Sequence, residues 1–148
     1  MDEKIKKIIN AGKTLAIIIE SDYKTDGIRF FTEDSHSQQL GYMNRATGYK
    51  IPPHVHNPVV REVVWTLEVL FIKSGKVRVD FYDEDQTYIE SRILLKGDVI
   101  LLAAGGHGFE MLEPSEIIEV KQGPYCGEKD KTRFETVVND KIRLNNEK

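Results

Sequence analysis

The chain has 148 residues, a single cysteine, and a formal net charge of −3. A chain of this length can bury enough surface to fold as one domain without disulfide bonds. The lone Cys126 excludes an internal disulfide framework and a multi-cysteine zinc site. The slight negative charge argues against a broad surface for phosphate backbones, so no nucleic-acid partner is expected.

The N-terminal segment, residues 1–13, is predicted to be a short helix. Ile5, Ile8 and Ile9 follow the i, i+3, i+4 spacing of a helical face, and Gly12 is a suitable end. The segment is rich in lysine, and its apolar runs are too short for an export signal or a membrane span. A cytoplasmic protein without a membrane partner is therefore expected.

After Gly12 the sequence changes to short β-branched and apolar runs separated by turn residues. This texture predicts a single all-β sandwich or barrel domain over residues 14–137. Residues 132–138 are predicted to form one more strand or helix, and residues 138–148 a C-terminal tail that frays from Asn139. The predicted strands are 14–20, 28–32, 39–44, 66–72, 76–82, 87–95, 99–102, 109–112 and 116–122.

The two strong strands 66–72 and 76–82 are separated by a Ser74-Gly75 turn, which predicts a β-hairpin. Paired residues of a hairpin share a face, and one face combines five apolar side chains with Glu68. An ionised carboxylate that faces a core is costly unless it is paired or binds a metal, so Glu68 becomes a candidate site residue. The apolar members of that face are Leu70, Ile72, Val77, Val79 and Phe81.

Val69 and Phe71 fall on the opposite face of the same strand. Two large apolar side chains on an outer face need cover. We expect a homodimer to provide this cover, with an N- or C-terminal extension as the alternative.

His54-Val55-His56 is the second chemically distinctive feature. Residues two apart on an extended backbone project to one side, so two imidazoles side by side form a chelate for a divalent metal. Pro52 and Pro53 stiffen the approach to this pair. His107 lies in a glycine-rich loop, and together with Glu68 these histidines would make a complete first shell with room for water or substrate.

These motifs resemble those of the cupins. Gly48 is followed by five residues and the His-Val-His pair, Glu68 by six residues and Gly75, and Gly97 by five residues and a glycine-rich stretch that ends at His107. The resemblance implies a cupin-type double-stranded β-helix, a jelly-roll barrel. It also implies one divalent metal (Zn, Fe, Mn or Ni) whose ligands are His54, His56, Glu68 and His107.

The chain departs from the cupin pattern most strongly at residues 57–67, where eleven residues separate His56 from Glu68. This stretch is open to two interpretations, a lid over the barrel mouth or a displaced strand, and in the second case Glu62 competes with Glu68 as the carboxylate. Two smaller departures are Ala103 in place of the second motif's proline and Met111 in place of its frequent asparagine. In addition, His107 follows Gly105 by one residue fewer than usual.

The resemblance implies a metal-dependent enzyme of the isomerase, epimerase or dioxygenase type, acting on a small oxygen-rich metabolite. A faint likeness of residues 119–125 and 131–134 to small cupins of surface-sugar metabolism favours a sugar-derived substrate. Glu68, Glu62 and Tyr49 are the candidate catalytic groups. Arg61 and Lys121 are the candidates for binding an anionic part of the substrate, although Arg61 could equally pair with Glu62.

Two other functions stay open. One is a non-catalytic module that binds a small molecule or carbohydrate around a structural metal. The other is a metal-free isomerase, in which a histidine acts as acid or base, if the long gap breaks the ligand set. Trp65 is expected in a core or an interface rather than as a substrate platform.

Overall fold

The structure is a computed structural model that describes residues 2–146. Met1, Glu147 and Lys148, at the ends of the predicted helix and tail, lie outside the described residues. The all-β class is confirmed, and among the described residues no helix has the length and apolar character needed to span a membrane. The elements are β1 (Ile5–Asn10), β2 (Lys13–Ile19), β3 (Gly27–Phe30), β4 (Gly41–Asn44), β5 (Glu68–Ser74), β6 (Lys76–Tyr82), β7 (Tyr88–Leu95), β8 (Val99–Leu102), β9 (Gly106–Met111), β10 (Glu116–Lys121) and a 3₁₀ turn η1 (Asn139–Lys141).

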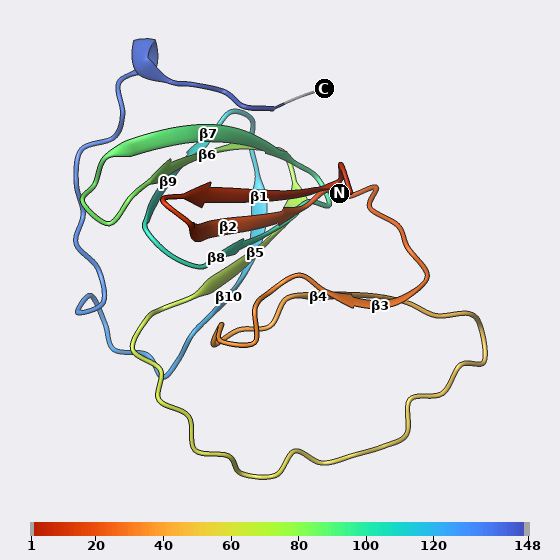
Figure 1. Ribbon diagram of the computed structural model, residues 1–148. Helices are drawn as coiled ribbons and strands as arrows, with labels where there is room; N and C mark the ends of the chain where they lie inside the picture. The colour runs from red at the N-terminus through yellow and green to blue at the C-terminus, as the bar shows by residue number, and fades with distance from the viewer. Residues whose placement is uncertain (1, 147–148) are drawn as a thin grey trace.

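The strands form two main antiparallel sheets and one separate two-stranded ribbon (Figure 1). The larger sheet has the order β1-β2-β8-β5-β10, and the smaller one has the order β7-β6-β9. Aliphatic side chains from both sheets meet in one core cluster that includes Leu70, Val79 and Ile100. The segment with the β3–β4 ribbon forms a third layer on the outer face of the larger sheet.

The predicted N-terminal helix is wrong, because residues 5–10 form strand β1, paired antiparallel with β2. Ile5 and Ile8 have helical spacing but lie in different core clusters, one on each face of the sheet. A strand that is covered on both faces buries side chains of either parity, so its apolar spacing imitates a helix. Ala11 and Gly12 both have positive φ, as a tight two-residue hairpin requires.

The predicted hairpin between β5 and β6 is also wrong. β5 pairs with β8 and β10, whereas β6 pairs with β7 and β9, so Gly75 carries the chain from one sheet to the other. The predicted core face is nevertheless buried, since alternation along each strand does not depend on which strand is the neighbour. Gly75 has a φ of +92°, and a Cβ there would overlap the Pro114 carbonyl oxygen and Ser115.

We expect Gly75→Ala to destabilise the fold strongly. The left-handed backbone alone costs an alanine about 1–2 kcal/mol, and the overlap with residues 114–115 adds to it. Gly48→Ala is the matched control, because Gly48 has a φ of +87° and open space around its Cβ position. Urea denaturation of the two variants should show the larger loss at residue 75. Equal losses would mean that the close approach to residues 114–115 contributes nothing.

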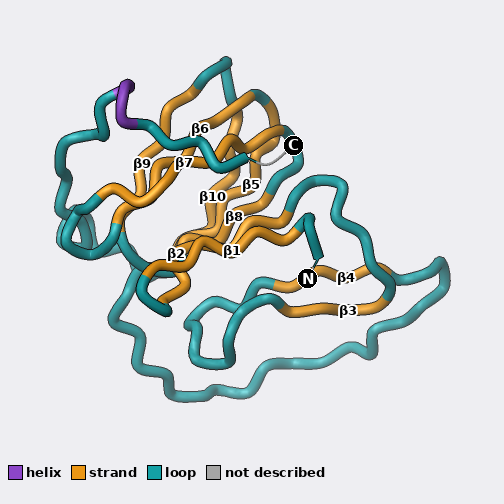
Figure 2. Tube along the Cα trace, turned by 45° about the horizontal axis from the view of Figure 1, so that its top comes forward, coloured by secondary structure: helices purple, strands orange, loops and turns teal. Residues whose placement is uncertain are grey.

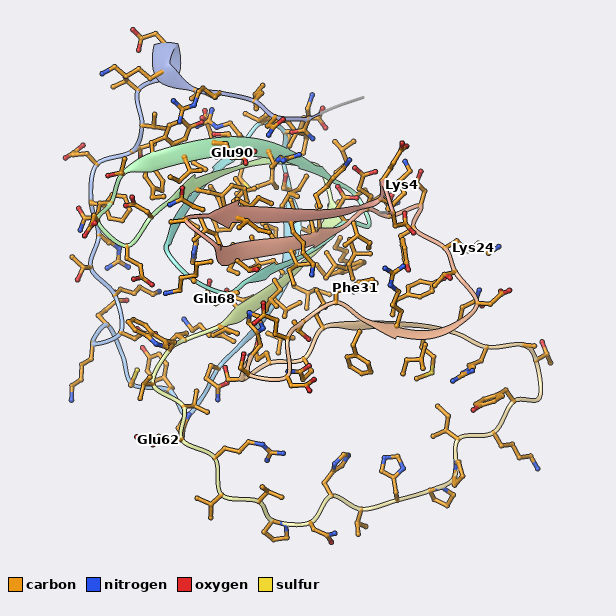
Figure 3. All side chains as sticks on the ribbon, in the orientation of Figure 1. Lys4, Lys24, Phe31, Glu62, Glu68 and Glu90 are labelled. Carbon is orange, nitrogen blue, oxygen red and sulfur yellow. The ribbon has the colours of Figure 1, made fainter. Side chains whose placement is uncertain are left out.

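A second core cluster covers the outer face of the larger sheet. Tyr23, Phe31 and Leu40, from the segment that contains β3 and β4, pack there against strand residues such as Ile17 and Leu101. Figure 3 labels Phe31 in this layer. Val69 packs against the same cluster, so an internal segment provides its cover. Phe71 remains 38% exposed beside its cross-strand neighbour Ile118.

The C-terminal segment is attached to the smaller sheet rather than frayed. Leu144 forms a parallel bridge with Ser91 of β7, and the backbone N–H of Ser91 donates to the Arg143 carbonyl oxygen. Residues 122–138 contain no strand, so the predicted strand or helix at 132–138 is wrong. This irregular stretch is held at its end by the Val137 N–H, which donates to the Tyr82 hydroxyl.

The two sheets form an open sandwich, and the closed barrel implied by the cupin resemblance is not seen. β9 ends the smaller sheet and β10 ends the larger one, each with one unpaired edge. The residues between β4 and β5 run outward as a long extended loop, the yellow stretch of Figure 1, and Figure 2 shows the same separation from another side. Every residue from 45 to 65 is exposed.

Candidate functional site

Glu68 and His107 meet at one end of the space between the two sheets. Glu68 is the first residue of β5 and shares the inner face with Leu70, while His107 on β9 is paired with the inner-facing Phe81. The His107 Nε2 and Glu68 Oε2 atoms are 3.1 Å apart. Thus the strand alternation of two different sheets directs an imidazole and a carboxylate at each other.

Lys121 is the third member of this cluster. It is the cross-strand partner of Glu68 on β10, and its Nζ lies 3.9 Å from Glu68 Oε1. The hydrogen bond with His107 holds the pKa of the Glu68 carboxyl below its usual value, with help from the Lys121 charge and against the effect of burial. Glu68 is therefore an ionised, largely buried carboxylate between two basic groups. Figure 3 labels Glu68 on β5.

His107 of this cluster lines a pocket of about 350 Å³, whereas Glu68 and Lys121 are not among the residues that line it. Residues 102–107 line the pocket, together with Trp65, Lys13 and Phe134. Trp65 is 68% exposed, so the expectation of a core position is wrong, and Lys13 Nζ lies 6.0 Å from the indole ring. Gly105 has a φ of +68°, and a Cβ there would press on the Tyr82 carbonyl oxygen, so glycine lets this wall pass close to β6.

His54 and His56 lie in the outer loop, away from Glu68 and His107. Their rings are neighbours, with centroids 5.2 Å apart, so the predicted side-by-side arrangement is present. His54 Nδ1 lies 2.9 Å from the Pro52 carbonyl oxygen, so this ring nitrogen has its partner within the loop. Both side chains are exposed.

The other candidate residues belong to the same outer loop. Tyr49 is exposed, and the Arg45 guanidinium lies 4.4 Å from its ring centroid. Arg61 and Glu62 line a separate hollow beside His36 rather than the pocket of His107. Figure 3 shows Glu62 on the outer loop and Glu68 on the sheet, so the structure does not bring these two carboxylates together.

The single chain does not assemble the predicted metal site. Within residues 2–146, no group of three or more histidine, cysteine or acidic side chains has metal-binding geometry. Glu68 and His107 supply two of the four implied ligands, and His54 and His56 form a separate pair. As arranged in one chain, these residues do not fit a divalent ion.

Sequence reasoning identified Glu68, His107 and Lys121 but missed the pocket beside them. Lys13 and Thr132 line it without belonging to any motif, and nothing local in the sequence links them to residue 107. No protein-family model, curated protein or solved structure matches the chain.

Proposed function

We propose that the chain is a cupin-type enzyme that acts on a small oxygen-rich, sugar-derived metabolite in the pocket beside Glu68 and His107. The observation that carries this proposal is the 3.1 Å contact of Glu68 with His107, which lines a 350 Å³ pocket. A carboxylate with a hydrogen-bonded imidazole next to an open pocket is a general acid–base pair. The reaction class we propose is isomerisation or epimerisation at a carbon next to a carbonyl.

In this reaction Glu68 accepts the proton from the carbon, and the electron pair moves to the carbonyl oxygen to give an enediolate. His107 protonates that oxygen to give the enediol. In isomerisation the neighbouring hydroxyl then gives its proton to His107 while Glu68 returns its proton to the neighbouring carbon. In epimerisation the first oxygen returns its proton to His107 while a proton is added to the other face of the original carbon. Lys121 provides positive charge for an anionic group of the substrate. The Trp65 ring offers an apolar face for a sugar ring.

A divalent ion is a separate part of this proposal. We propose that Zn, Fe, Mn or Ni binds when His54 and His56 reach Glu68 and His107, since imidazole and carboxylate ligands suit all of these ions.

Solvent-exchange NMR tests the activity. The protein is incubated in D₂O with dihydroxyacetone, glyceraldehyde and aldohexoses, and loss of the C–H signal next to the carbonyl is followed. We expect deuterium incorporation with at least one of these probes. Tight binding of a sugar without exchange would favour the non-catalytic binding module. The absence of both binding and exchange would overturn the proposal.

Elemental mass spectrometry of the purified protein, before and after dialysis against Zn²⁺, tests the metal. We expect about one ion per chain in the native protein and a clear loss in His54→Ala. If no metal binds even after reloading, the metal part of the proposal is overturned. The reaction would then be the metal-free one carried by Glu68 and His107.

A further inference from the structure

The pocket that His107 lines has a wall that is remote from His107 in the sequence. Thr132 and Phe134 line it, and both belong to the irregular stretch of residues 122–138. The Phe134 side chain is 37% exposed, so most of its surface lies against the rest of the chain. Since this stretch contains no strand, contacts with other segments must set the position of the Phe134 ring.

Tyr82 and Gly106 form the surface on which the Phe134 ring lies. The rings of Phe134 and Tyr82 meet edge to face, with centroids 4.9 Å apart and planes at 86°. Tyr82 and Gly106 are cross-strand partners of β6 and β9. A Cβ on Gly106 would lie 2.9 Å from Phe134 Cζ, and the φ of Gly106 is not in the left-handed region. The glycine therefore provides room for the ring.

Two hydrogen bonds hold the chain on either side of Phe134. Before it, the Asp130 carboxylate accepts from the Thr66 hydroxyl at 3.0 Å. After it, the backbone N–H of Val137 donates to the Tyr82 hydroxyl at 3.0 Å. Packing and hydrogen bonds that lock the supporting residues make a wall precise enough to select among ligands. The Phe134 ring is thus a fixed wall of the pocket.

The size of the pocket indicates what this wall selects. Its volume of about 350 Å³ is near the lower end of the range of about 300–1,000 Å³ for small-molecule sites. Phe134 and Trp65 both line it, and they come from the two segments that the Thr66–Asp130 hydrogen bond joins. A rigid apolar wall discriminates by size, because a larger ligand has no room where the ring lies.

We propose that Phe134 is a specificity-determining residue of this pocket and restricts the substrate to a single sugar ring without a bulky substituent on the Phe134 side. The identity of the ligand as a sugar rests on the proposed function. The wall itself rests on the contacts of Phe134 with Tyr82 and Gly106. Removal of the ring by Phe134→Ala should open the pocket to larger sugars.

Fluorescence titration measures the selectivity, because Trp65 is the only tryptophan of the sequence and lines the pocket. Glucose, N-acetylglucosamine and maltose are added to the wild type, to Phe134→Ala and to Tyr125→Ala. The last is the matched control, since the exposed Tyr125 belongs to the same stretch but does not line the pocket. We expect Phe134→Ala to raise the affinity for at least one of the two larger sugars, relative to glucose, by about tenfold. The control should keep the wild-type ratio.

Gly106→Ala tests whether the position of the ring matters. The new methyl group would meet the Phe134 ring in the wild type but not in Phe134→Ala, so it should change the selectivity only when the ring is present. The Tyr82 Cβ would lie 3.3 Å from the same methyl group in both backgrounds. An equal change in both backgrounds would assign the effect to Tyr82 and overturn the role of Phe134.

Circular dichroism confirms that each variant is folded, and Phe134→Leu, which keeps an apolar side chain beside Tyr82, replaces Phe134→Ala if the alanine variant does not fold. We expect a smaller shift in the same direction from the leucine. An unchanged ratio in a folded variant, with sugar bound by the wild type, would overturn this inference alone. Shifted binding without deuterium exchange would overturn the isomerase and support the role of Phe134. A wild type that binds none of the three sugars would overturn both.

Discussion

Asp80→Ala should unfold the protein at much lower urea concentration than the wild type. Asp80 is 1% exposed, and its two carboxylate oxygens accept from Arg78 Nε at 2.8 Å and from a terminal nitrogen of Arg78 at 3.0 Å. Removing one partner of a buried ion pair costs about 3–5 kcal/mol, and we expect the lower end of this range because Glu110 Oε2, 2.7 Å from Arg78 Nη1, still faces the guanidinium. That is a large part of the total stability of a domain of this size.

Asp80 also belongs to a hydrogen-bond network that reaches the C-terminal segment. The Ser91 hydroxyl also donates to Asp80, and the Tyr88 hydroxyl lies 2.6 Å from Ser91 Oγ. The backbone N–H of Arg143 donates to that same Tyr88 hydroxyl at 2.9 Å, so the network joins the smaller sheet to the C-terminal segment. Loss of Asp80 should therefore also loosen residues 143–146.

Urea denaturation followed by circular dichroism measures the loss, and hydrogen exchange of residues 143–146 reports the loosening. Glu128→Ala is the control, because the ion pair of Glu128 with Arg133 is exposed and its loss should change little. The double variant Arg78→Met/Asp80→Leu should be less destabilised than Asp80→Ala, since it leaves no buried charge. An Asp80→Ala protein as stable as the control would show that the network is not needed for folding.

The strands were predictable because their signals are local. β-branched runs and turn residues located nine of the ten strands, and alternation identified the inner face of β5 and β6. β1 was misassigned because its apolar spacing reflects two cores, a tertiary fact that local periodicity cannot show. Likewise, a Ser74-Gly75 turn looks like a hairpin, but the pairing of β5 with β10 and of β6 with β9 decides its geometry.

The candidate site shows the same difference between residues that local signals place and residues that they do not. Glu68 and His107 are set by strand alternation, so they meet once the two sheets stack. His54 and His56 lie in residues 45–65, which contain no strand, so strand alternation does not set the direction of their side chains. The eleven-residue gap between His56 and Glu68 was the sign in the sequence that these two parts of the motif could lie apart.

Glu68→Gln should lower the solvent-exchange rate of the proposed reaction by about 10²–10⁴-fold, because a carboxamide cannot accept the proton. The substitution keeps the shape of the side chain, and Glu68 is only 13% exposed, so the pocket should retain its form. Lys121→Met should instead weaken substrate binding, raising KM for anionic substrates with a smaller change in kcat. These opposite signatures separate the base from the anion-binding group.

His107→Ala and Glu68→Gln should not have additive effects, because the two groups are in contact at 3.1 Å and act as one unit. We expect the double variant to be about as slow as Glu68→Gln alone, measured by deuterium incorporation. Glu62→Gln is the matched control, since Glu62 lines a different hollow, and it should leave the rate unchanged. Additive losses for Glu68 and His107 would mean that the imidazole works independently of the carboxylate, and a large loss in Glu62→Gln would move the base to the outer loop.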